Sequence, residues 1–368
     1  MGSPPVKVEE SFDVDNATEF DDRKCPDPEV RFFLFTRYNL DEQQLIHIDD
    51  TFDASNLSTS FFNPRHPSKI IIHGFRSDMF LTPLFNMKTE YLQRDSFNIF
   101  FVDWYNLSSS INYPAVVHNI VHVGACTAQL VNRIRDAGGV DIHLIGFSLG
   151  AQLANYVANS LKPDYLLPRI SGLDPALPLF VTSNVDHKLD PSDAQFVDVF
   201  HCNGLMQGQL ERCGHVDFFM NGGVYQPGCA SNGNHVFSCS HHRCATYFME
   251  SIQSPLGFYG WQCQSYLHYI FGMCPFDDIQ MALAGDGCES TAQGMFFVKT
   301  NSEFPFAKGR HEFAANDASP HNTTDDELPS TQDSYERDPN DIDKTTSSES
   351  GEKFRRFDPK VVLIDDGN

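Results

Sequence analysis

Short runs of β-branched and aromatic residues recur along the middle of the chain and alternate with longer stretches of helical periodicity. The apolar runs are nearly continuous, which is typical of strands buried on both faces of a sheet. They lie at residues 30–37, 69–73, 97–104, 141–146, 196–201 and 295–300. Residues 115–137 and 149–161 instead place apolar side chains at i, i+3, i+4 and i+7, as helices covering a sheet do. This alternation predicts an α/β domain with a mostly parallel sheet.

The two ends of the chain lack this pattern. Residues 1–29 and 307–368 are polar, acidic and short of large apolar side chains. Such segments cannot bury enough apolar surface to fold, and we expect both to be disordered. The folded α/β domain is therefore expected to span residues 30–306.

The charge balance limits the partners that the chain can bind. Its 26 Lys and Arg residues stand against 49 Asp and Glu residues, for a formal net charge of -23. A basic face that would condense on phosphates or on an anionic membrane is not expected, so nucleic acid is excluded as a partner. No run of about 18 apolar residues occurs, and we expect no transmembrane segment.

The cysteines indicate the compartment. Ten are present, nine of them between Cys126 and Cys288 at short intervals. This pattern predicts disulfides made in an oxidising environment, and hence a secreted protein. A reduced enzyme with scattered thiols or a zinc site is the alternative, which the absence of any CxxC pair disfavours. Glycosylation sequons add little support to secretion; they lie at Asn16, Asn56, Asn106 and Asn322. The first residues contain no apolar segment of a signal peptide, which fits a mature or tagged chain or else argues against secretion.

The first candidate for chemistry is the G-x-S-x-G sequence at residues 146–150. An apolar strand runs directly into it and an amphipathic helix leaves it, as a nucleophile elbow requires. The two glycines allow the sharp turn that lifts the Ser148 hydroxyl above the sheet edge. The alternative is an ordinary glycine-rich turn between a strand and a helix.

A serine nucleophile needs a base, and the base needs an acid to orient it. α/β-Hydrolases supply these groups in the order Ser, Asp, His. Asp174 follows a short apolar run that starts at Arg169 and precedes a proline, so it fits the acid; capping a turn is its other interpretation. His241 and His242 both follow Cys239, and spacing alone does not choose between them.

The tetrahedral oxyanion needs two backbone N–H donors. The amide of Leu149, directly after the nucleophile, is one candidate. The amide of Phe75, in the loop that follows the buried run at residues 69–73, is the other. His73 in the same loop is interpreted as a structural residue that fixes it.

Several ordered segments together resemble the animal pancreatic lipase family. They are IIIHGF at 70–75, FVDW at 101–104, HLIGFSLGAQLANYVA at 143–158, SGLDPALPLF at 171–180, LDPSDAQFVDVFH at 189–201, GHVDFFMNGGVYQPGC at 214–229 and CSHHRCATYFMESI at 239–252. The resemblance covers about residues 30–300. It implies an α/β-hydrolase fold and an ester hydrolase acting on lipids, without a cofactor. It also implies that Ser148, Asp174 and His241 form the triad and that Phe75 and Leu149 donate to the oxyanion.

Three departures from the family bear on the substrate. Residues 307–368 form an acidic tail where the family's lipases carry a C-terminal β-sandwich, so we expect neither that sandwich nor a colipase-type partner. The family's lid lies between two cysteines that correspond to Cys229 and Cys239, and here only Val236 and Phe237 in that span are large and apolar. The neighbouring loop at 201–215 is also short. These features resemble phospholipase A1-type and insect members more than digestive triglyceride lipases.

Spacing, aided by the resemblance, favours three disulfides: Cys229–Cys239, Cys263–Cys274 and Cys202–Cys213. The remaining cysteines are left unassigned: Cys25, Cys126, Cys244 and Cys288.

Some members of the family carry a calcium site near the LDPSD segment. Asp190 and Asp193 match two of its carboxylate ligands. A further acidic ligand is replaced by Val185 and a nearby arginine by Lys188, which argues against calcium. Acids exposed in a turn are the alternative interpretation.

The sequence therefore predicts a secreted serine ester hydrolase of lipids, of the phospholipase A1 type. Its substrate is expected to be a phospholipid or a neutral acylglycerol. Two alternatives stay open: a neutral triacylglycerol lipase, and a non-catalytic yolk-like lipid carrier. Retention of every catalytic residue disfavours the carrier.

Overall fold

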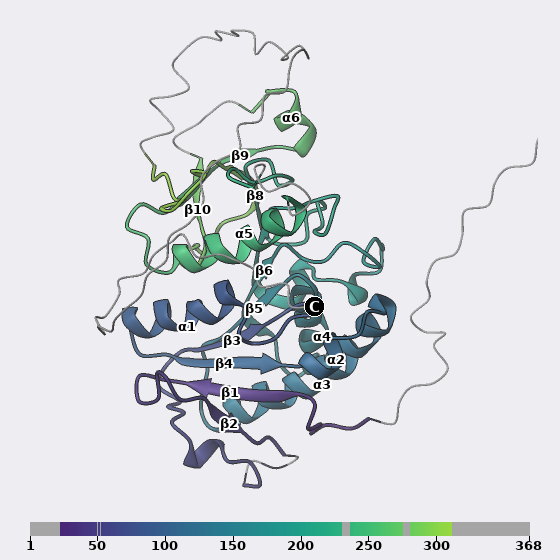
Figure 1. The fold of residues 1–368 in the computed structure, drawn as a ribbon, viewed down its shortest axis with the longest axis vertical. Helices are drawn as coiled ribbons and strands as arrows, with labels where there is room; N and C mark the ends of the chain where they lie inside the picture. The colour runs from purple at the N-terminus through teal and green to yellow at the C-terminus, as the bar shows by residue number, and fades with distance from the viewer. Residues whose placement is uncertain (1–22, 50, 52, 230–235, 275–279, 311–368) are drawn as a thin grey trace, which may run out of the picture. The chain divides into compact units, whose positions relative to one another are not determined.

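A computed structural model describes residues 23–310 except 50, 52, 230–235 and 275–279 (Figure 1). Its strands are β1 (Arg31–Phe35), β2 (Gln44–Ile46), β3 (Ser68–Ile72), β4 (Asn98–Asp103), β5 (Ile142–Phe147), β6 (Leu167–Leu173), β7 (Ala194–His201), β8 (Val216–Met220), β9 (Phe258–Cys263), β10 (Met281–Ala284) and β11 (Gly294–Val298). Its α-helices are α1 (Thr82–Arg94), α2 (Tyr105–Ser108), α3 (Tyr113–Asp136), α4 (Leu149–Leu161), α5 (Val236–Ser251) and α6 (Tyr266–Ile270).

The strands form one sheet of eleven, in the order β10-β9-β11-β8-β7-β6-β5-β3-β4-β1-β2. The seven strands from β11 to β4 are all parallel. Antiparallel pairs flank them, β1 and β2 on one side and β9 and β10 on the other. This is the mostly parallel α/β-hydrolase sheet that the sequence predicts.

Both faces of the sheet are covered by helices, which explains the continuous apolar strands. Side chains alternate between two faces along a strand. Ile70 and Ile72 of β3 therefore pack in the core cluster under α3 and α4, and Ile71 packs in the cluster under α1 and α5. The same helix pairs lie together on each side (Figure 1). No alternating polar face exists on such strands because neither face meets water.

The order of the strands indicates where the fold would bind a ligand. The chain moves outward from β3 to β4, returns to place β5 on the other side of β3, and then continues through β6, β7 and β8. The helices after β3 and β5 therefore leave on opposite faces of the sheet. In open α/β sheets, ligands bind at the carboxyl ends of strands where the order reverses. Here that point lies after β3 and β5.

A buried polar cluster lies at the other edge of the sheet. Lys69, His143 and Arg169 stand in register on β3, β5 and β6, near the amino ends of these strands. Arg169 pairs with Asp198 at 2.8 Å, and the Lys69 ammonium lies 3.4 Å from Asp286. Burial and the nearby Lys69 ammonium lower the pKa of His143, so the imidazole stays neutral there. The cluster fastens Asp286, which follows β10, to the central strands.

Four disulfides are present: Cys25–Cys126, Cys202–Cys244, Cys229–Cys239 and Cys263–Cys274. Two of the predicted pairs are confirmed, but Cys202–Cys213 is wrong. Cys202 packs in the core cluster under α1 and α5, whereas Cys213 packs in the cluster on the opposite face. A disulfide cannot bridge the sheet, so Cys202 pairs with Cys244 of α5 on its own side. Cys213 and Cys288 are buried free thiols.

The folded domain extends beyond both of its predicted ends, residues 30 and 306. Cys25 is bonded to Cys126 of α3, and Asp27 lies 2.9 Å from the His122 ring of the same helix. The amides of Phe306 and Ala307 donate to the Glu250 carboxylate. Residues 23–29 and 307–310 are therefore structured rather than disordered. The rest of both predicted tails, 1–22 and 311–368, lies outside the described residues.

Among the helices that the structure describes, none is long and apolar enough to cross a membrane.

Candidate active site

Ser148 lies at the turn between β5 and α4, at the point where the strand order reverses. Its φ of 56° is a left-handed conformation that a non-glycine residue rarely adopts. Its amide donates to Leu173 O at 2.9 Å, and its carbonyl accepts from the Ala151 amide at 3.0 Å. These bonds hold the strained turn, and the side chain is half-buried at the sheet edge.

The glycines around Ser148 are required by close backbone contacts. A Cβ on Gly146 would lie 2.4 Å from Gly150 O, and one on Gly150 would lie 2.4 Å from Ile72 O. The turn therefore packs against itself and against the end of β3. This explains both glycines of G-x-S-x-G as steric requirements of the elbow.

Asp174 lies directly after β6, next to the elbow in the sheet. Its side chain is fully buried. One carboxylate oxygen, Oδ1, accepts hydrogen bonds from the amides of Cys202 at 2.7 Å and Asn203 at 3.0 Å. The other oxygen, Oδ2, lies 2.5 Å from Nδ1 of His241. Both oxygens are thus held, and the carboxylate is fixed in orientation toward one imidazole.

His241 and His242 differ in their partners, which separates the two candidates. The bond to Asp174 places the proton of His241 on Nδ1 and leaves Nε2 as the basic nitrogen. His242 instead donates from Nδ1 to the carbonyl of Ser238 in its own helix, at 2.7 Å. Burial and the adjacent His241 lower the pKa of His242. His241 therefore has the acid partner that a catalytic base needs, and His242 does not.

Gly208 is a residue of the site that the sequence pattern did not reveal. A Cβ at this position would lie 2.4 to 2.5 Å from the three atoms of the Asp174 carboxyl group. The loop after β7 thus covers the carboxylate, and only a residue without a side chain fits at position 208. Nothing in the sequence near Gly208 signals this contact, because it joins residues far apart in the chain.

Gly208→Ala is expected to lower kcat by about 100-fold, because the new methyl group displaces the carboxylate by a fraction of an ångström to 1 Å. The measurement is steady-state hydrolysis of a soluble ester. Gly287→Ala is the matched control, since its Cβ would meet only the Leu283 side chain within 4 Å. Equal kcat in both variants would show that the carboxylate tolerates the shift.

The loop after β3 lies against the elbow. A Cβ on Gly74 would lie 3.0 Å from Ser148 Cβ and 3.4 Å from the Leu149 amide nitrogen. The Phe75 amide follows directly, and among the hydrogen bonds of the described residues neither the Phe75 nor the Leu149 N–H has an acceptor. Two N–H groups on adjoining segments beside the serine are what an oxyanion site requires.

His73 fixes that loop. Its ring is buried, stacks on Trp104 at a centroid distance of 5.4 Å and accepts a hydrogen bond from the Trp104 amide at 3.1 Å. The Trp104 indole in turn donates to His73 O at 3.0 Å. His73 is therefore part of the support of the loop rather than a second base.

The predicted lid lies partly outside the described residues. Cys229 and Cys239 are joined, and α5 begins at Val236 and continues through Phe237. Residues 230–235 between the disulfide and the helix are not described.

Asp190 and Asp193 do not fit a calcium site. The Lys162 ammonium lies 3.1 Å from Asp193 Oδ1, where a cation would bind, and Asp190 Oδ1 accepts from the Ser192 amide. Asp193 Oδ2 accepts from the Asp190 amide, which completes a capping box on a turn of 3₁₀ helix at Pro191–Asp193. Burial and the neighbouring Asp190 raise the pKa of Asp193 to about 7, although Lys162 favours the charged form. A lysine already neutralises the carboxylate that would bind the metal.

Calcium and chelators are accordingly expected to leave the thermal midpoint unchanged. A ligand that binds the folded protein alone would raise the midpoint with its concentration. Differential scanning calorimetry with EDTA and with millimolar CaCl₂ makes the comparison. A calcium-dependent rise that Asp193→Asn abolishes would contradict this interpretation of the Lys162 contact.

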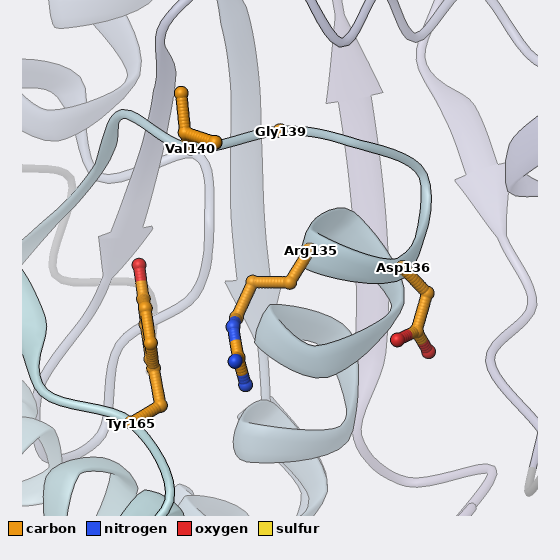
Figure 2. Close-up of a pocket in the computed structure, with 5 residues that line it drawn as sticks. All are labelled: Arg135, Asp136, Gly139, Val140 and Tyr165. Atoms are coloured by element: carbon orange, nitrogen blue, oxygen red, sulfur yellow. The ribbon is translucent and has the colours of Figure 1, made fainter.

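One cavity of about 350 Å³ lies elsewhere, where α3 ends and the chain leads into β5 (Figure 2). Arg135 and Tyr165 line it, with the guanidinium carbon 3.9 Å from the centre of the tyrosine ring. It opens before the amino end of β5, whereas Ser148 follows the carboxyl end. The cavity is therefore separate from the candidate active site.

The fold and the site together define an α/β-hydrolase: a parallel sheet, a serine on a strained elbow, and an Asp–His pair at the same sheet edge. A sequence model of the Lipase family matches residues 7–306, and the chain belongs to this family, that of the pancreatic lipases.

Individual relatives agree with this assignment. The chain is 34% identical over 317 residues to a pancreatic triacylglycerol lipase of Mus musculus. The matched region covers 77% of this chain and 66% of the relative. It is 38% identical over 246 residues to pancreatic lipase-related protein 2 of Cavia porcellus, covering 64% and 54%. The chain thus spans less than two thirds of the length of these relatives.

Among solved structures, a phospholipase/carboxylesterase from Dyadobacter fermentans matches with a TM-score of 0.28 and 18% identity, over 40% of this chain and 71% of that one.

Proposed function

We propose that this protein is a serine hydrolase that cleaves carboxylic esters of lipids. The observation that carries the proposal is the 2.5 Å contact between His241 Nδ1 and Asp174 Oδ2, at the sheet edge that also holds Ser148. This contact leaves the opposite ring nitrogen free to act as a base.

The proposed reaction has two halves. His241 Nε2 takes the proton of the Ser148 hydroxyl as its oxygen attacks the ester carbonyl, and the carbonyl electron pair moves onto oxygen beside the Phe75 and Leu149 amides. The intermediate collapses, the C–O bond breaks, and the leaving alcohol takes the proton from His241. Water then repeats the sequence on the acyl-enzyme and releases the fatty acid. Asp174 stabilises the imidazolium that forms in both halves.

Exposed apolar side chains at the same sheet edge support a lipid substrate. Phe80, Ile111, Val181 and Leu205 lie in the loops after β3, β4, β6 and β7, and they are 55 to 86% exposed. The carboxyl ends of parallel strands meet at one edge, so these four loops surround the position of Ser148. Exposed apolar groups on loops at this edge are suited to acyl chains and to a lipid surface.

A fluorophosphonate probe tests the enzyme proposal directly. We expect wild-type protein to be labelled on Ser148 and Ser148→Ala to be unlabelled, with mass spectrometry of the tryptic peptide as the readout. Ser171→Ala is a matched serine control, since Ser171 lies one strand away but is buried in the polar cluster. Absence of labelling in the wild type would favour the non-catalytic carrier.

Within this function, we propose the sn-1 ester of phospholipids as the preferred substrate. Only nine residues lie between Cys229 and Cys239, and a disulfide closes the span, which leaves little apolar area to exchange on a lipid surface. A small cover leaves room for a polar head group beside the ester, whereas a triglyceride needs apolar walls for its other chains. The names of the relatives, several of them pancreatic triacylglycerol lipases, favour the neutral-lipid alternative.

A concentration series distinguishes these substrates. We expect the rate with a short-chain phosphatidylcholine to rise smoothly through the micelle threshold, because activation scales with the apolar area that a lid moves. The measurement is pH-stat hydrolysis, with a triglyceride of equal chain length beside it. A sharp increase at the threshold together with preference for the triglyceride would establish the neutral lipase instead.

We also propose that the protein works outside the reducing cytoplasm. Four disulfides support this, because cytosolic proteins seldom keep such bonds.

A further inference from the structure

We propose that the Cys202–Cys244 disulfide is a positioning element of the Ser148–Asp174–His241 triad, which it serves by fixing the distance between the acid and the base. The proposal rests on the proposed hydrolase function and adds two residues to its machinery. It starts from two bonds of Cys202. The Cys202 amide is hydrogen-bonded to Asp174, the acid, and the Cys202 sulfur is bonded to Cys244 of α5, the helix that carries His241, the base.

Cys202 reaches the acid through its backbone. Its amide donates to Asp174 Oδ1 at 2.7 Å, the shorter of the two bonds that the oxygen accepts. Its side chain turns to the face covered by α5 and is fully buried there. A shift of the Cys202 backbone therefore moves the donor that orients the carboxylate.

Cys244 reaches the base through one turn of helix. It lies three residues after His241 in α5, and residues with this spacing share a helix face about 5–6 Å apart. Both side chains are buried against the sheet. The Cα atoms of Cys202 and Cys244 are 5.7 Å apart across the disulfide.

These links close a small ring around the acid–base bond. The ring runs from the Asp174 carboxylate to the Cys202 amide, through the disulfide to Cys244, along one turn of α5 to His241, and back to Asp174 at 2.5 Å. Only the two hydrogen bonds of Asp174 are non-covalent in it. Without the disulfide, α5 would be held to the end of β7 by packing and by Gln226, whose amide group donates to Cys202 O and whose backbone N–H donates to Ser240 Oγ.

The test compares Cys202→Ala/Cys244→Ala with the matched pair Cys263→Ala/Cys274→Ala. The disulfide of the second pair joins cysteines 11 positions apart and encloses α6, whose Tyr269 stacks on Phe297 of β11. Both double variants lose one crosslink, but only the first touches the ring. We expect the first to lower kcat by about 10- to 100-fold with KM unchanged, as a misplacement of up to 1 Å does, and the second to keep wild-type kcat.

A second readout separates positioning from general stability. The proton between His241 Nδ1 and Asp174 gives a downfield NMR resonance, which we expect to weaken or move in the first variant at a temperature where calorimetry shows it folded. Should that variant fail to fold, Cys202→Val/Cys244→Ala refills the apolar volume and is measured in its place. Wild-type kcat and an unchanged resonance would overturn the positioning role. Failure of wild-type protein to react with the fluorophosphonate would instead overturn the proposed function.

Discussion

Ser148→Ala and His241→Ala are each expected to lower kcat by about 10⁴-fold or more, and the double variant is expected to be little worse than either. The serine cannot attack without the base, and the base has no substrate-directed role without the serine, so the second change removes nothing further. Steady-state hydrolysis of a soluble ester at saturating substrate measures all three variants. A double variant far below both singles would show that the two residues act independently.

His242→Ala is the control for this set. Its ring bonds to Ser238 O in its own helix rather than to Asp174, so its loss should affect kcat only mildly. A collapse of activity in His242→Ala, with His241→Ala still active, would show that the neighbouring imidazole is the base.

The second large effect is on stability, at Asp286. This carboxylate contacts the Lys69 ammonium at 3.4 Å, the Arg94 guanidinium at 2.7 Å and the Tyr91 hydroxyl at 2.6 Å. Asp286→Asn leaves the buried Lys69 ammonium and the Arg94 guanidinium without their carboxylate partner. We expect the free energy of unfolding to fall by about 3–5 kcal/mol, measured by urea denaturation. Asp136→Asn is the control, because the Asp136 carboxylate is exposed to water and its ion pair with Arg133 is therefore worth less than about 1 kcal/mol.

The same carboxylate predicts how stability depends on pH. Burial opposes its ionisation, but Lys69, Tyr91 and the nearby guanidinium groups outweigh burial and lower the pKa of Asp286 to about 2. Because this value is below that of an unfolded aspartate, the contribution is complete above about pH 4 and is lost as the pH falls toward 2. The difference corresponds to about 2 kcal/mol. Asp286→Asn should remove this part of the acid dependence, and an unchanged pH profile would contradict it.

The sequence pattern predicts most strands of the sheet, including β1 and β11, but it gives no apolar run for β2, β8, β9 or β10. Strands β3, β4, β5 and β7 are found because both of their faces are apolar. β8 is interrupted by Asp217, a buried acid that is tolerated because it accepts from the Cys213 amide and contacts His201 at 2.9 Å. In α1 the buried Lys88 interrupts the apolar periodicity of the helix. Its burial is tolerated because its ammonium lies 4.6 Å from the centre of the Phe35 ring and donates to Leu40 O. The partners of Lys88, and His201 as a partner of Asp217, lie too far away in the sequence for a local pattern to reveal them.

Some residues of the candidate site can be predicted from the local sequence and others cannot. Ser148 and its glycines form a local motif, and the chain order of hydrolases leads to Asp174. The choice of His241 over His242 needed the family resemblance, since the two differ only in what faces them. Gly208 and the partner of Cys202 have no local signal at all, because each depends on a contact between the end of β7 and another element.

The short antiparallel strands at the two sides of the sheet have a consequence for self-association. An open sheet exposes unpaired N–H and C=O groups only along its outermost strands, where another chain can add by backbone pairing. These are β2, with three residues, and β10, with four, whereas the interior β7 has eight. The longest and most apolar strands, which would aggregate most readily, are thus enclosed between partners. A large sheet of this kind presents little template for fibril-like growth, even where a lipid surface concentrates the protein.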